Sequence, residues 1–127
     1  MAANLQHTSY KSYGTSLYNN ALVSKRSGDY SRSVNEFLRA ASHLEEEISQ
    51  PDLSLGQRRG LQERLYSCYQ SLLVESILTP SNPLLVSILE RENSLDILDS
   101  GVEYYGRKTV ELAQQLEEYS RHKAIKR

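Results

Sequence analysis

Apolar side chains recur at steps of three and four residues in every long segment of this chain, and glycines and prolines separate the segments. Such spacing places the apolar residues along one side of an α-helix, which has 3.6 residues per turn. No segment alternates apolar and polar residues over the length of a β-strand. The pattern therefore predicts an all-α fold, an antiparallel bundle of four to five helices.

The breaks between segments set the ends of the expected helices. Gly28 suits the left-handed position after a helix, and Asp29 can cap the helix that follows. Because so few residues separate the first two helices, they should form an antiparallel hairpin. Two prolines in the segment 79–83 then interrupt the helical pattern. The expected helices end near Arg26, cover 30–49, run from Asp52 or Gln57 to about Ile77, follow Pro83 briefly, and cover 94–121.

The second helix carries a continuous apolar stripe. Its members are Val34, Phe37, Leu38, Ala41, Leu44 and Ile48. Phe37, the one phenylalanine of the chain, lies at the middle of this stripe, so we expect it to be buried. Glu45, Glu46 and Glu47 should lie largely on the solvent side of the same helix.

The last helix has the most regular pattern, a heptad-like seam that Ser94 can cap. The seam consists of Leu98, Val102, Tyr105, Thr109, Leu112, Leu116 and Tyr119. At 1.5 Å per residue the helix would reach about 42 Å, which is longer than the first two helices. We therefore expect its later part, around Leu112, Leu116 and Tyr119, to project from the bundle and to bind a second copy or another subunit.

Composition limits the class of protein. A chain of 127 residues fits one domain, so we expect residues 1–127 to form a single helical unit. The formal net charge of −1 argues against a domain that mainly grips nucleic acid. The single cysteine cannot form an internal disulfide, the first residues are polar, and no apolar run approaches the roughly 20 residues that span a bilayer. These features predict a cytoplasmic protein, with the nucleus as the alternative.

No arrangement of reactive side chains predicts catalysis. The three histidines, His7, His43 and His122, lack the spacing of metal ligands on one helix. His43 is expected on a solvated helix face. Cys68 lies between Tyr66 and Tyr69 in an apolar segment, which is typical of a buried core thiol and not of a nucleophile. We therefore expect no enzyme activity, no cofactor, no metal and no small-molecule substrate.

Residues 21–44 carry a recognisable motif. It reads Ala21-Leu22, Gly28-Asp29-Tyr30, Ser33, Phe37, Ala40-Ala41 and Leu44. This motif resembles the helical hairpins of MIT domains, the three-helix modules of ESCRT-associated ATPases, and of tetratricopeptide repeats. Small residues in it let two helices approach closely while the aromatic ring fills the crossing. Because no second copy appears at a period near 34, the MIT-like interpretation is favoured, with a three-helix core over about 9–78 and additional helices over 84–121.

The resemblance implies a function in protein–protein interaction. MIT-like modules bind short helical or extended partner segments in grooves between their helices. Carried to this chain, it implies a groove between the second and third helices, near Leu38, Ala41, Glu45, Leu65 and Tyr69. The predicted function is an adaptor in membrane-trafficking, ESCRT or autophagy assemblies, which meets membranes only through its partners. The alternative is a structural subunit that assembles through its last helix.

Overall fold

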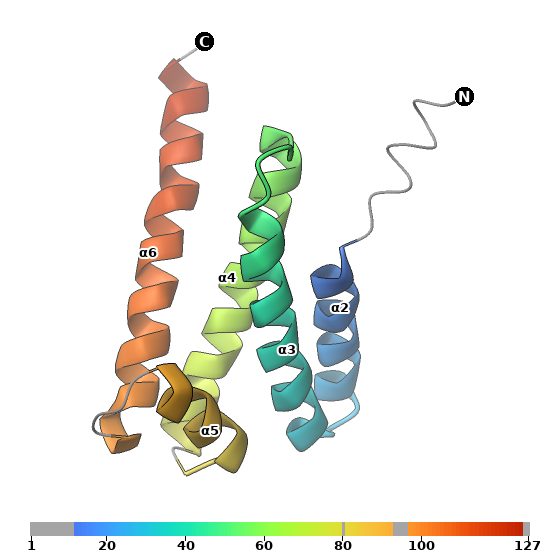
Figure 1. Ribbon diagram of the computed structural model, residues 1–127, viewed down its shortest axis with the longest axis vertical. Helices are drawn as coiled ribbons and strands as arrows, with labels where there is room; N and C mark the ends of the chain where they lie inside the picture. The colour runs from blue at the N-terminus through green and yellow to red at the C-terminus, as the bar shows by residue number, and fades with distance from the viewer. Residues whose placement is uncertain (1–11, 80, 93–96, 126–127) are drawn as a thin grey trace.

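The protein is built from helices that stand side by side, as the computed structural model shows for residues 12–79, 81–92 and 97–125 (Figure 1). The helices are α2 (Tyr13–Arg26), α3 (Tyr30–Ile48), α4 (Leu55–Leu78), α5 (Pro83–Glu92) and α6 (Ile97–Ile125). The order across the bundle is α2, α3, α4 and α6, and α5 lies at the lower end beside the start of α6. The described residues contain no strand, so the predicted all-α bundle is confirmed.

Local capping explains where the helices begin and end. Gly28 has a positive φ of 85° between α2 and α3, and the Asp29 side chain accepts a hydrogen bond from the Arg32 N–H. At α4, Ser54 and Gln57 form a capping box, in which each side chain binds the backbone N–H of the other. The start of the third helix, which the sequence left open between Asp52 and Gln57, is therefore Leu55. The expected cap of the last helix, Ser94, lies outside the described residues.

The hairpin of α2 and α3 is closely packed because small residues line the crossing. Ala21 and Ala40 are fully buried, and Phe37 is buried as its place in the stripe predicts. Near the start of α2, a Cβ atom added to Gly14 would lie 2.7 Å from Leu44 Cγ and 3.0 Å from the Leu44 backbone nitrogen. No side chain larger than hydrogen fits at Gly14 unless α3 moves.

Polar contacts also join the two helices of the hairpin. Buried Ser24 on α2 donates a hydrogen bond of 2.6 Å to the carboxylate of Glu36 on α3, which is itself buried. At the other end, Glu47 accepts hydrogen bonds from the Ser12 hydroxyl and, at 2.9 Å, from the Gly14 N–H. A carboxylate at this position satisfies free N–H groups at the start of α2. Of the three glutamates expected largely on the solvent side, Glu45 and Glu46 are exposed, whereas Glu47 is half-buried because it caps the neighbouring helix.

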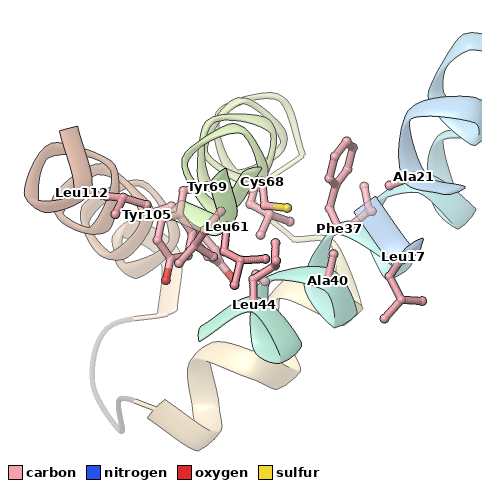
Figure 2. Packing of buried hydrophobic residues seen from close by; sticks show 14 of the residues in the cluster. Leu17, Ala21, Phe37, Ala40, Leu44, Leu61, Cys68, Tyr69, Tyr105 and Leu112 are labelled. Atoms are coloured by element: carbon pink, nitrogen blue, oxygen red, sulfur yellow. The ribbon is translucent and has the colours of Figure 1, made fainter. Parts of the chain in front are cut away.

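One hydrophobic core includes residues from each of the five helices in the described part of the chain. Figure 2 shows it from Leu17 and Ala21 on α2, through Phe37, Ala40 and Leu44 on α3 and Leu61, Cys68 and Tyr69 on α4, to Tyr105 and Leu112 on α6. α5 adds Leu85, which is fully buried. Because α4 packs against both α3 and α6, it joins the hairpin to the C-terminal helix.

The expected projection of α6 is wrong at Leu112. Leu112 is only 5% exposed, and Gln62 on α4 donates a hydrogen bond of 3.2 Å to Gln115 on α6. Leu116 and Tyr119 are half-buried. The length argument compared α6 with the first two helices, but the helix that covers it is α4, which has 24 residues.

The seam of α6 is also shifted in part. Val102, expected in the seam, is 41% exposed, whereas the neighbouring Gly101 is buried together with Tyr105 and Leu112. The side chain of Leu98 lies outside the described residues. The buried side of α6 therefore carries a glycine at the place where the heptad pattern indicated valine.

The close approach at Gly14 predicts an unusual response to alanine. Gly14→Ala should lower the free energy of unfolding by about 1–3 kcal/mol, because the added methyl group overpacks the contact with Leu44. The matched control is Gly56→Ala, since both glycines are second residues of their helices and a Cβ at Gly56 has nothing within 4 Å. Gly56→Ala should raise stability by about 0.5–1 kcal/mol through helix propensity. Urea denaturation measures both changes, and a stabilising Gly14→Ala would contradict the packing described.

Candidate binding groove

Cys68 and His43, two reactive side chains that the structure describes, take part in packing. Cys68 is fully buried, and its burial, followed by the nearby Glu45 carboxylate, raises the pKa of its thiol to about 12. His43 is half-buried, with its ring edge-on to Tyr13 at 4.7 Å between centroids, so the helix face on which it was expected to be solvated is only partly exposed. Within the described residues, no three His, Cys, Asp or Glu side chains group closely enough to hold a metal ion. His7 and the His122 side chain lie outside the described residues.

A groove of about 470 Å³ on the surface is bounded by four helices. Its lining residues are Asn35, Leu38, Arg39, Ala41, Ser42, His43 and Glu45 from α3, Tyr69 from α4, Leu84 and Ser87 from α5, and Tyr104 and Tyr105 from α6. Tyr69 and Tyr105 are buried at its base, whereas Leu84 is 39% exposed. The groove therefore combines an apolar surface with a polar edge along α3.

A polar contact joins the three helices around this groove. The buried Tyr69 hydroxyl on α4 donates a short hydrogen bond to the Glu45 carboxylate on α3. Lys108 Nζ on α6 lies 3.9 Å from that carboxylate and 5.3 Å from the centre of the Tyr104 ring. Burial, followed by the charge of Glu45, raises the pKa of Tyr69 far above its ordinary value of 10.0. The hydroxyl therefore stays protonated and acts as the hydrogen-bond donor.

A second, smaller cavity of about 290 Å³ lies beside the same contact. Glu45 and Tyr69 line both cavities, and Leu65 and Leu112 line the smaller one. Gln62 is also in its wall, and the Gln62 Oε1 atom is buried without a hydrogen-bond partner among the described residues. The contact of Tyr69 with Glu45 thus divides the α3–α6 side of the bundle into two hollows.

Tyr13 positions the basic side chains at the polar edge of the larger groove. The Arg39 guanidinium donates a hydrogen bond of 3.2 Å to the Tyr13 hydroxyl, and His43 packs against the same ring. Tyr13 is the first residue of α2, so the close hairpin places it against α3. None of the ion pairs among the described residues includes Arg39.

The structure brings together most of the residues that the sequence pointed to. Leu38, Ala41, Glu45 and Tyr69 all line the larger groove, and Leu65 lines the smaller cavity with Leu112. Leu116 and Tyr119 line neither of these two. The groove differs from the expected one in its far wall. α6 packs against α4, so the open space faces α3 on one side and α5 and α6 on the other.

Sequence reasoning missed the contribution of the later helices to the groove. Leu84 and Ser87 on α5, and Tyr104 and Tyr105 on α6, complete its lining. Tyr105 had a signal, since it belongs to the heptad seam. The others line the groove because α5 lies beside α6, which no local pattern indicates.

Comparison with known proteins adds no relative. The chain matches no known protein family, no curated protein and no solved structure.

None of the helices, over the residues that the structure describes, combines the length and the apolar character needed to cross a lipid bilayer.

The contact at Tyr69 predicts a measurable loss of stability. Tyr69→Phe removes the hydrogen bond to Glu45 and should lower the free energy of unfolding by about 1 kcal/mol, because Glu45 is partly solvated. Tyr66→Phe is the matched control, since Tyr66 is half-buried on the same helix and its hydroxyl has no hydrogen bond to another described residue. An equal effect of the two substitutions in urea denaturation would show that the Tyr69 hydroxyl contributes nothing.

The pH dependence of the free energy of unfolding provides a second test of the Tyr69 contact. Because the pKa of Tyr69 is raised in the folded state, its contribution is fully present below pH 10.0, the ordinary pKa, and is lost as pH rises above it. In the unfolded chain Tyr69 loses its proton above that pH, which favours unfolding. The fall in stability on the alkaline side should therefore be smaller in Tyr69→Phe than in the wild type.

Proposed function

We propose that the protein is a non-enzymatic adaptor that binds a short segment of a partner protein in the groove bounded by α3, α4, α5 and α6. The observation that carries the proposal is the groove itself, which is open in the free chain and has an apolar surface beside a polar edge. Its volume of about 470 Å³ accommodates a few side chains and not a folded domain.

Apolar anchors supply most of the affinity in such a groove. Leu84 is 39% exposed and Leu38 is half-buried, so both have apolar surface that a partner side chain can cover. Burial of one large aliphatic side chain contributes about 1.5–3 kcal/mol. The polar groups of Asn35 and Ser42 lie along the exposed edge, where they can set the orientation of the bound segment.

The resemblance of residues 21–44 to MIT-domain hairpins supports the same proposal. Ala21, Ser33, Phe37, Ala40 and Ala41 of that motif are buried, whereas its Tyr30 is 65% exposed. MIT-like modules bind partner segments between helices, and on this basis we place the partner in a membrane-trafficking, ESCRT or autophagy assembly in the cytoplasm. α6 would then form part of the binding groove in addition to the three-helix core.

Assembly through the last helix is not our proposal. Tyr105 and Leu112, which belong to the expected seam, are buried in the core of the chain itself. A second copy could reach these side chains only if α6 left α4, and that would expose the apolar residues of both helices.

The test compares two equivalent leucine substitutions. Leu84 lies in the first turn of α5 and lines the groove, and Leu55 is the first residue of α4, 69% exposed and outside both cavities. Leu84→Glu should abolish the capture of partner proteins from a lysate of cells that express the protein, whereas Leu55→Glu should preserve it. Quantitative mass spectrometry of the captured proteins gives the readout. The same captured set with both variants would contradict binding in the groove.

A further inference from the structure

The two charged side chains that line the groove differ in whether another residue of the chain already balances their charge. Arg39 and Glu45 are the Arg, Lys, Asp or Glu residues among those that line it. The Glu45 carboxylate already accepts the Tyr69 hydroxyl and lies 3.9 Å from Lys108, so its charge is balanced within the chain. Arg39 donates to the neutral Tyr13 hydroxyl and has no carboxylate partner among the described residues. Among the described residues, the groove therefore offers a cation without an offsetting anion.

Arg39 lies next to the apolar surface of the groove. Arg39 follows Leu38 along α3, and both line the groove opposite Leu84 of α5. Asn35, Arg39 and Ser42 are spaced by four and three residues, so they form one row along the edge. A guanidinium held by a neighbouring hydroxyl loses less conformational freedom when it binds a carboxylate, and its planar N–H groups match the two carboxylate oxygens.

We propose that the groove selects an acidic peptide segment, in which a bulky apolar side chain packs on Leu38 and Leu84 while a nearby Asp or Glu carboxylate pairs with Arg39. This inference rests on the proposed function and adds the chemistry of the partner. Tyr13 acts as a positioning residue, because its hydroxyl and ring orient Arg39 and His43 at the edge.

The experiment starts from peptides selected without bias. A library of random dodecapeptides displayed on phage is selected on the immobilised full-length chain, and enriched peptides are then measured by fluorescence anisotropy. The enriched sequences should carry Asp or Glu within a few residues of a bulky apolar side chain. Their affinity should fall as salt increases, since a rim charge pair is screened by ions.

Charge reversal at Arg39 then identifies the partner of the acidic residue. Arg39→Glu should weaken an enriched peptide by at least about tenfold, because an attraction becomes a repulsion. Changing the acidic residue of that peptide to Lys should restore binding to Arg39→Glu and weaken binding to the wild type. Arg26→Glu is the control, since Arg26 is exposed at the end of α2 and lines neither cavity, and it should leave the affinity unchanged.

The outcomes separate this inference from the proposed function. Peptides that are lost with Leu84→Glu but bind equally to wild type and Arg39→Glu would overturn the inference and leave binding in the groove intact. Enrichment of basic peptides, or an equal effect of Arg26→Glu and Arg39→Glu, would also overturn it. If no enriched peptide is lost with Leu84→Glu, both the inference and the proposed function are wrong.

Discussion

The hydrogen bond from the buried Tyr69 hydroxyl to Glu45 is the contact on which the candidate site depends. A buried hydroxyl needs a hydrogen-bond acceptor, and Glu45 on the neighbouring helix α3 provides one for Tyr69. Lys108 then brings α6 to the same carboxylate. Three helices meet at one point, while the space beside that point stays open as a groove of about 470 Å³. The polar contact thus joins α3, α4 and α6 at the side of the open groove.

The α2–α3 hairpin fixes the wall that carries the polar edge. The contact of Gly14 with Leu44, together with the cap that Glu47 provides to α2, sets the position of the start of α2. That position places Tyr13 against Arg39 and His43. Gly14 and Glu47, which do not line the groove, thereby contribute to the orientation of its basic side chains.

The sequence was sufficient to predict the features that are determined by residues close together in the chain. The helices and the burial of Phe37 followed from periodicity and from breaks such as Gly28, because helix ends depend on nearby residues. The burial of Leu112 and the cap at Glu47 could not be predicted in this way. Both depend on which helix faces which residue across the bundle. The sequence around an apolar or acidic residue has the same local pattern whether that residue is buried or exposed. Four of the suggested groove residues nevertheless line the groove, since they share one face of α3 and α4.

An amide-resolved NMR titration with a peptide selected on the protein tests the central claim most directly. The account predicts that chemical shifts change over Asn35–His43 on α3 and Leu84–Ser87 on α5, which together border the groove. Amides of α2 beyond its first turn should keep their shifts. Changes concentrated on the outer face of α2, or at the exposed end of α4 around Ile77, would contradict binding between α3, α5 and α6.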